Sequence, residues 1–178
     1  MTTVTPEQAG TGTRTDAPVL LVAYDGSPMS ESQLHLAARS ANDIGGQVRV
    51  LYVVLRNWHL PLDVPLSREE EERANALFDQ AERIVTRYGV SCVMEVDRAR
   101  SIGEAIVADA AESTARTIFI GLRDSKRLGT SLFISGTLRH VLQNAPCPVQ
   151  IGYLPAGLPE HFALDSGSES RKSEVDSR

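Results

Sequence analysis

Continuous apolar runs alternate along this chain with segments that repeat apolar residues at helical spacing. The first run, residues 19–24, stops at Asp25-Gly26, and a second, residues 117–120, stops in the same way at Gly121. A short continuous apolar run is typical of a strand buried on both faces of a parallel sheet. Ligands bind at the carboxyl edge of such sheets, so the two runs predict one crevice that holds Asp25 and Gly121.

Three more segments have strand character. Residues 48–55 are β-branched and nearly all apolar, which predicts a second strand covered on both faces. From residue 90 to 97 apolar and polar residues alternate, which indicates a half-exposed strand near a sheet edge. In residues 149–153 Gln150 and Gly152 alternate with apolar residues, so we expect one face of the last strand to be wet or to lie close to a partner backbone.

Four helices are predicted between the strands. The first begins at Ser27-Pro28 or at the capping box 30–33, and Gly45-Gly46 ends it. Capping boxes also begin helices at Ser67 and Ser101, and we interpret the glutamates after Ser67 as helix-end electrostatics rather than a partner surface. One stripe of the first helix holds Leu34, Ala37, Ala38, Ala41 and Ile44, and the buried stripe of the second holds Ala74, Leu77, Phe78, Ala81, Ile84, Val85 and Tyr88. The third is a helix of small residues with Ile102, Ala105, Ile106, Asp109 and Ala110, and the fourth carries the apolar residues Leu138, Val141 and Leu142.

The alternation of five strands and four helices predicts an α/β domain with a parallel sheet and helices on both faces. We expect this domain to span residues 17–156, between disordered tails at 1–16 and 157–178 that have little to bury. The fourth strand, 117–120, is expected to pass into a polar loop that starts at Gly121.

Charge and hydropathy narrow the function classes. The net charge is −5, and residues 17–156 hold 14 basic against 16 acidic residues, so we expect no nucleic-acid partner. We also expect no membrane segment, because no apolar run approaches about 18 residues, and no signal peptide, because the polar N-terminus lacks an apolar core. We therefore expect a cytoplasmic location.

The two cysteines, Cys92 and Cys147, are expected to be buried reduced thiols, since neither belongs to a Cys-x-x-Cys pair. The four histidines show no ligand spacing with each other or with the cysteines, so we expect no metal site.

The segment after the fourth strand could bind an anion. Glycines at 121 and 129, the cations Arg123, Lys126 and Arg127, and a helix that begins near Ser135 would suit a phosphate. The alternative is a solvated basic loop whose glycines serve only its turns.

Asp25 also has two interpretations. Its carboxylate could accept hydrogen bonds from a ribose hydroxyl or a base amine, or Asp25-Gly26-Ser27 could form a turn followed by a helix cap. We expect Tyr24 and Tyr52 to be packing residues. We expect no catalysis, because no nucleophile is paired with a base along the sequence.

Four segments of the chain resemble the universal stress protein family. They are 19–28, 50–54, Gly103-Glu104-Ala105-Ile106, and 121–149 with its closing run Ser135-Gly136-Thr137-Leu138 through Ala145-Pro146-Cys147-Pro148-Val149. The resemblance implies a Rossmann-like domain with strand order 3-2-1-4-5. It also implies a homodimer formed through the last strand, 149–153, and in one branch of the family ATP, with Mg²⁺, as ligand.

By this resemblance Asp25 would contact the adenine or ribose and Val53 would lie at the base pocket. Gly121, Gly136 and Thr137 would hold phosphates, and Arg123 is our electrostatic addition. Asp124 stands where the family motif has its second glycine, and eleven residues rather than nine precede Gly136-Thr137. These departures leave a second hypothesis open, a dimeric interaction module whose crevice binds no nucleotide.

Overall fold

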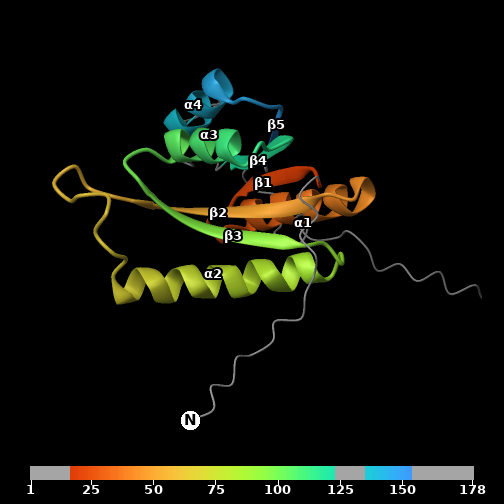
Figure 1. Ribbon diagram of the computed structural model, residues 1–178, viewed down its shortest axis with the longest axis horizontal. Helices are drawn as coiled ribbons and strands as arrows, with labels where there is room; N and C mark the ends of the chain where they lie inside the picture. Colours follow the sequence, from red (N-terminus) through yellow and green to blue (C-terminus); the bar gives the residue numbers. More distant parts are fainter. Residues whose placement is uncertain (1–16, 123–134, 154–178) are drawn as a thin grey trace, which may run out of the picture.

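The computed structural model describes residues 17–122 and 135–153. Its nine elements alternate as expected from the sequence (Figure 1): β1 Val19–Ala23, α1 Pro28–Ile44, β2 Gln47–Leu55, α2 Arg68–Thr86, β3 Cys92–Ala99, α3 Ile102–Glu112, β4 Thr117–Leu122, α4 Gly136–Asn144 and β5 Val149–Tyr153. The tails expected at 1–16 and 157–178 lie outside the described residues.

The five strands form one parallel sheet in the order β3-β2-β1-β4-β5. The predicted fold class and strand order are therefore confirmed. The order reverses between β1 and β4, because the chain builds β2 and β3 on one side of β1 and then crosses to the other side. A crevice forms outside the carboxyl ends of the strands at such a switch point.

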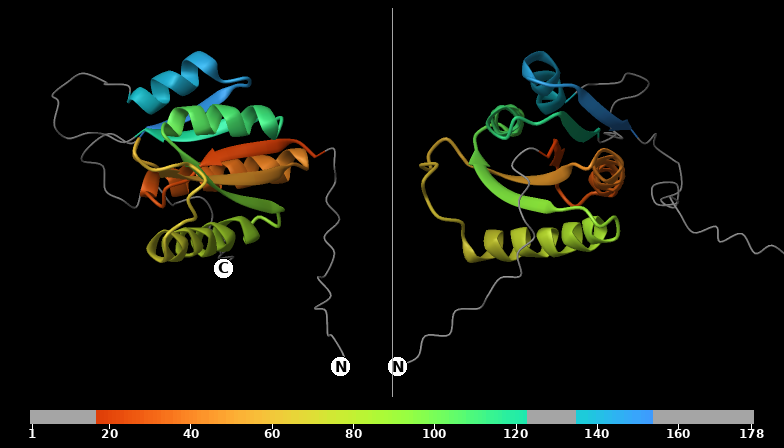
Figure 2. Two further views of the ribbon diagram at one scale, coloured as in Figure 1. Left: turned by 60° about the vertical axis from the view of Figure 1, so that its left-hand side comes forward. Right: turned by 45° about the vertical axis from the view of Figure 1, so that its right-hand side comes forward.

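Helices cover both faces of the sheet (Figure 2), as the sequence predicts. On one face α1 and α2 pack against side chains that include Leu20, Val22 and Val50. On the other, α3 and α4 pack against Leu21, Leu51 and further residues of β4. Alternate residues of the central strands thus enter two separate cores, which explains why these strands are apolar throughout.

The first three helices begin at capping residues that the sequence predicts. Ser27 caps α1 with Pro28 at the first helical position, so the first of the two predicted starts is correct. Ser67 and Glu70 form the complete capping box of α2, and Ser101 accepts a hydrogen bond from the Glu104 backbone N–H.

Three details differ from the sequence pattern. Ile44 and Leu142 were placed among the apolar positions of their helices but are exposed, because each lies in the last turn of its helix where the sheet no longer covers it. Gly121 does not begin a loop. It belongs to β4, which runs on to Leu122 because Gly121 and Leu122 pair with Gly152 and Tyr153 of β5.

The edge strand β3 agrees with the alternating pattern of its sequence. The side chains of β3 alternate between half-buried and exposed along its first half, as predicted for an edge position. Among the helices of the described residues, none combines the length and apolarity that crossing a membrane requires.

Candidate functional site

A pocket of about 280 Å³ opens at the carboxyl edge of the sheet. The ends of β1, β2 and β4 line it together with the N-terminal parts of α1, α3 and α4. Its lining residues are Ala23, Tyr24, Asp25, Ser27, Ser30, Leu51, Tyr52, Val53, Ile102, Ile106, Ile120, Gly121, Ser135 and Thr137. Asp25, Val53, Gly121 and Thr137, named from the sequence, therefore share one pocket.

The lining has two chemical characters. Apolar side chains come from the strands and from α3, with Val53, Ile102 and Ile106 among them. Hydroxyl and carboxylate groups come from the residues that follow β1, with Asp25 among them, and from the N-terminus of α4, with Thr137 among them. An apolar slot beside a few polar groups is the usual form of a site for a ring-bearing polar molecule.

Asp25 forms the turn before the helix cap, which was one of its two interpretations. Its carboxylate accepts a hydrogen bond from the Ser27 backbone N–H at 3.0 Å, and Ser27 in turn caps α1 by accepting from the Ser30 N–H at 3.3 Å. Gly26, between them, has φ +75°, a conformation that favours glycine. Asp25 thus holds the β1–α1 turn and also lines the pocket.

Gly121 has a packing role that its position in the sequence does not indicate. A Cβ built on Gly121 would lie 2.6 Å from Cγ of Met29 in α1, and one on the paired Gly152 would lie 2.8 Å from Sδ of the same Met29. The two glycines therefore let α1 approach β4 and β5 closely. Gly152 is buried under Gln33 and Met29, so the close neighbour expected at this strand is α1 of the same chain.

The N-terminus of α4 lies at the pocket rim. Ser135 caps the helix by accepting from the Leu138 N–H at 3.2 Å, and both Ser135 and Thr137 line the pocket around Gly136. A helix N-terminus carries partial positive charge and unpaired N–H groups, which suit an anion. Arg123, the remaining predicted residue, lies outside the described residues.

Gly103 sets the distance between the two pocket helices. A Cβ at this position of α3 would lie 2.9 Å from Cβ of His140 in α4 and 3.1 Å from the Thr137 carbonyl oxygen. The close approach brings Thr137 into the same pocket as Ile102. This explains in physical terms why a glycine stands one residue into α3.

The tyrosines follow the packing interpretation in part. Tyr24 is buried in the core on the α1 and α2 side, and burial raises the pKa of its hydroxyl above the ordinary value. Tyr52 is half-buried, and both residues contribute to the pocket lining. The sequence indicated Ser135 only as the start of the helix beside the anion site, and it did not indicate Ser30, Ile102 or Ile106 as lining residues. The capping box at Ser101 was the available signal for Ile102.

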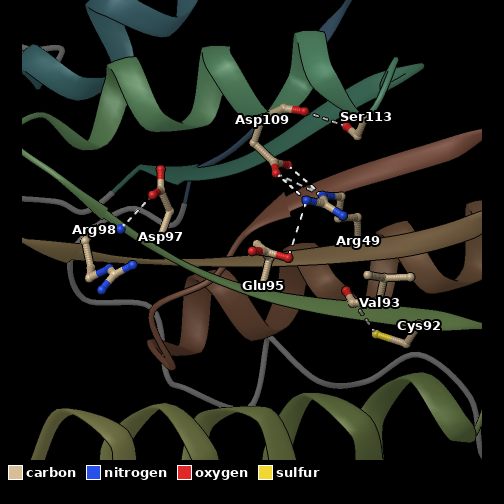
Figure 3. Close-up of polar contacts among 8 residues, drawn as sticks. All are labelled: Arg49, Cys92, Val93, Glu95, Asp97, Arg98, Asp109 and Ser113. Carbon is tan, nitrogen blue, oxygen red and sulfur yellow. Dashed lines mark hydrogen bonds and ion pairs between the residues drawn. The ribbon is translucent and has the colours of Figure 1, made fainter. Parts of the chain in front are cut away.

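Charged groups beside the pocket are paired with each other. Arg49 lies between Asp109 and Glu95 on the α3 side of the sheet, and ion pairs join it to both (Figure 3). Within residues 17–122 and 135–153, no group of three or more His, Cys, Asp or Glu side chains is placed to hold a metal ion. Cys92 and Cys147 are free thiols, as predicted, but they are half-buried rather than buried, because Cys92 lies in the edge strand β3 and Cys147 in the turn before β5.

The family model of the universal stress protein family matches residues 18–151. The chain belongs to the universal stress protein family. The match covers both sides of the pocket, from the strand that precedes Asp25 to the last strand of the sheet. The resemblance noted in the sequence is thereby confirmed.

Solved structures of this family share the fold. A universal stress protein from Lactobacillus plantarum is 22% identical, with a TM-score of 0.63, over 75% of this chain and 96% of its own. One from Archaeoglobus fulgidus in complex with dAMP is 22% identical, with a TM-score of 0.59, over 76% of this chain and 96% of its own. One from Arabidopsis thaliana with AMP bound is 14% identical, with a TM-score of 0.53, over 78% of this chain and 93% of its own. No curated protein matches the chain significantly.

Proposed function

We propose that this member of the universal stress protein family binds an adenine nucleotide at the carboxyl edge of its sheet, with ATP and Mg²⁺ as the favoured ligand. The observation that carries the proposal is the single pocket that joins an apolar slot at Val53 to the capped N-terminus of α4. A nucleotide has the same two parts, a flat apolar base and an anionic phosphate group. In this proposal the protein acts in a stress response by binding the nucleotide in the cytoplasm, without catalysing a reaction.

Each part of the ligand has a place in this proposal. The base lies against Val53 and Ile102, because both are apolar and both line the pocket, one from β2 and the other from α3. Asp25, at the end of β1, accepts a hydrogen bond from the base or ribose. Backbone N–H groups at Gly136 and Thr137 hold phosphate oxygens, aided by the dipole of α4.

The related structures support the base and sugar end of this proposal. Two of them are described as complexes with dAMP and with AMP, ligands that share the adenine ring and a single phosphate. The proposal that the ligand is ATP rather than a monophosphate rests on the positive end of the α4 dipole and on the charge of Arg123.

Calorimetric titration with Mg-ATP tests the proposal. We expect saturable heat with wild type, weaker binding for Asp25→Asn, and no measurable binding for Asp25→Ala. The asparagine variant keeps an oxygen that accepts from the Ser27 N–H, so it separates the carboxylate charge from the turn. Asp79→Ala, on the exposed side of α2, is the matched control. No heat and no thermal stabilisation of wild type at millimolar ligand would remove the nucleotide.

A series of ligands tests the phosphate end. If Gly136 and Thr137 hold phosphates, affinity rises from adenosine through AMP and ADP to ATP. Thr137→Val keeps the size of the side chain but removes its hydroxyl. We expect this variant to weaken ATP more than adenosine. Equal affinities across the series would place the phosphates in solvent.

The interaction module without a nucleotide is the second candidate. Its supporting observation is that Asp25 and Gly121 already have structural roles, in the β1–α1 turn and against Met29. This hypothesis predicts that Mg-ATP changes neither the heat signal nor the melting temperature. Tight ATP binding that Asp25→Ala abolishes would exclude it.

We propose a homodimer formed through β5. In the described sheet this strand pairs with β4 alone, and its Ile151 and Tyr153 are exposed. An edge strand with exposed apolar residues favours pairing with its copy across a two-fold axis. We expect a dimer mass by light scattering at micromolar concentration and a monomer for Ile151→Glu, with Leu36→Glu on α1 as a control of similar exposure. A monomeric wild type would contradict this arrangement.

A phosphate-release assay tests the absence of catalysis. We expect no phosphate above the buffer rate when the protein is incubated with Mg-ATP for hours, since Asp25 is the only carboxylate in the described lining and it is bonded to the Ser27 N–H. Release that scales with protein concentration and is lost in Asp25→Ala would make the protein an ATPase.

A further inference from the structure

The helix α4 is placed by its neighbour α3 more than by the sheet. The two helices lie side by side (Figures 1 and 2), and α3 is the element that α4 contacts most extensively. Within the described residues, α4 forms no ion pair and no side-chain hydrogen bond with a strand. Leu138 and Val141 join it to the apolar cluster on that face of the sheet. The position of its N-terminus therefore depends on how closely α3 lets it approach.

Gly103 of α3 sets this approach, and the atoms opposite it cannot move aside separately. A Cβ on Gly103 would lie 2.9 Å from Cβ of His140 and 3.1 Å from the Thr137 carbonyl oxygen. The oxygen belongs to the backbone of α4 and the Cβ is bonded directly to it, so no rotation of a side chain relieves the crowding. Ordinary contacts begin near 3.4 Å, so an added methyl group must separate the two helices by about 0.5 Å.

The helix α3 is the fixed member of this pair. Arg49 of β2 donates three hydrogen bonds of 2.7 to 2.9 Å to the carboxylate of Asp109, which lies in α3 and is buried. Because α4 has no comparable attachment to a strand, we expect the separation to displace α4 and to leave α3 in place. The displaced part is its first turn, since the Thr137 carbonyl oxygen faces Gly103.

We propose that Gly103 is a positioning residue for the phosphate end of the ligand, a role that rests on the nucleotide site proposed above. In that site Val53 and Ile102 contact the base from β2 and α3, whereas Gly136 and Thr137 of α4 hold the phosphates. A displacement of α4 changes the second set of contacts and leaves the first. Hydrogen bonds from backbone N–H groups to phosphate oxygens weaken steeply with distance and angle. Gly103 therefore favours ligands that carry phosphate over the nucleoside alone.

Calorimetric titration of wild type and Gly103→Ala with adenosine and with Mg-ATP tests this role. We expect the affinity for adenosine to change by less than about twofold, because the base end is intact. The affinity for ATP should fall by about tenfold or more, as expected when a hydrogen bond to a charged group is lost. A glycine with only a general structural role would affect both ligands equally or neither.

Gly46→Ala is the matched control for loss of stability. A Cβ on Gly46 would lie 2.6 Å from the Pro18 carbonyl oxygen, so it also crowds a backbone atom. Gly46 precedes β2 and lies at the amino edge of the sheet, away from the pocket. We expect this variant to melt at a lower temperature than wild type and to keep the wild-type ratio of ATP to adenosine affinity.

Removal of the opposing Cβ should restore the phosphate end. Gly103→Ala combined with His140→Gly lets the two helices approach again, so its ratio of ATP to adenosine affinity should return to within about threefold of wild type. His140→Gly alone measures the effect of a glycine within α4 and should leave the ratio unchanged. The double variant also carries the comparison if Gly103→Ala by itself does not fold.

Crystal structures of wild type and Gly103→Ala without ligand test the displacement independently of any nucleotide. We expect the first turn of α4 to lie about 0.5 Å further from β2 in the variant, with α3 unmoved. If α3 moves and α4 does not, or if the double variant keeps a tenfold lower ratio, the positioning role of Gly103 is overturned.

The two proposals fail in different ways. Wild type that binds neither adenosine nor Mg-ATP overturns the nucleotide site and the role of Gly103 with it. Wild type that binds ATP, together with a Gly103→Ala variant that loses both ligands equally or loses neither, overturns the role of Gly103 alone.

Discussion

The Arg49 guanidinium of β2 contacts both carboxylate oxygens of Asp109 in α3, at 2.7 to 2.9 Å (Figure 3). Asp109 is buried, and its hydrogen bonds with Arg49 raise the pKa of the guanidinium. The pair lies one helical turn from Ile106, which lines the pocket. It therefore fastens the helix that carries the pocket wall to the strand that carries Val53.

Removal of the Asp109 carboxylate should destabilise the fold. Asp109→Ala leaves the partly buried Arg49 guanidinium with Glu95, at 3.6 Å, as its remaining ion-pair partner in the described residues and with a weaker attraction to Glu112. We expect a loss of about 1–3 kcal/mol in the free energy of unfolding, measured by urea denaturation. Glu95→Gln is the control, because Glu95 is half-exposed and its removal should cost less than about 1 kcal/mol. Equal losses for the two variants would contradict the anchoring role of Asp109.

This ion pair shows where prediction from the sequence reached its limit. The runs at 19–24 and 117–120 predicted buried parallel strands because local composition alone determines them. Asp109 was placed in the third helix, but its burial was not predicted. Its partner, however, lies 60 residues earlier in a strand that the sequence gives as nearly all apolar, and only the folded register brings Arg49 beneath α3.

Part of the candidate site could likewise be predicted from the sequence, and part could not. Asp25 and Gly121 were predicted to meet because the carboxyl ends of neighbouring parallel strands share an edge. Ile102 and Ile106 were placed in the third helix but not in the site, since helical spacing does not tell which turn of a helix borders a pocket. The exposure of Trp58 and Leu60 in the segment between β2 and α2 was not predicted either, because a loop has no period from which exposure can be inferred.

Gly121→Ala tests the close contact between β4 and α1. The new Cβ would lie 2.6 Å from Met29 Cγ, so we expect a loss of about 1–3 kcal/mol in unfolding free energy. A second change, Met29→Ala, removes the obstructing atoms, and the double variant should lose less than the sum of the two single variants. Additive losses would mean that Met29 is not what requires a glycine. Gly136→Ala is the control, since nothing lies within 4 Å of its Cβ.

The His35–Tyr88 pair predicts a loss of stability in acid. His35 Nδ1 and the Tyr88 hydroxyl lie 3.0 Å apart, and burial, followed by the charge of Arg87, lowers the pKa of the imidazole below 6.5. Below this pH the unfolded chain binds a proton that the folded chain resists. The stabilisation from neutral His35 is therefore complete above pH 6.5 and is lost as the pH falls through the folded pKa.

The measurement compares wild type with His35→Gln by urea denaturation from pH 8 to pH 5. Burial raises the pKa of Glu31, an opposing contribution that is present in both proteins and cancels in the difference. We expect the stability of wild type to fall relative to the variant below pH 6.5, by at most about 1.4 kcal/mol per pH unit. Parallel curves over the whole range would show that His35 titrates normally.

The two cysteines should differ in their reaction with iodoacetamide. Burial, with a smaller contribution from Glu82, raises the pKa of the Cys92 thiol from 9.0 to about 12. At pH 8 its thiolate fraction is therefore about a thousandfold below that of the unfolded chain, and the thiolate is the species that reacts. We expect Cys92 to be alkylated far more slowly in the native protein than in urea, as followed by mass spectrometry of its peptide.

The pH dependence distinguishes this electrostatic protection from simple lack of access. In urea the alkylation rate of Cys92 should level off above pH 9. In the native protein it should continue to rise towards pH 11, because the thiolate is still forming there. A native rate that is slow but levels off near pH 9 would mean that the thiol has an ordinary pKa and that the packing of β3 against α2 merely excludes the reagent. Cys147 supplies the internal comparison, since burial raises the pKa of its thiol while a hydrogen bond from the Ile118 backbone N–H opposes the rise.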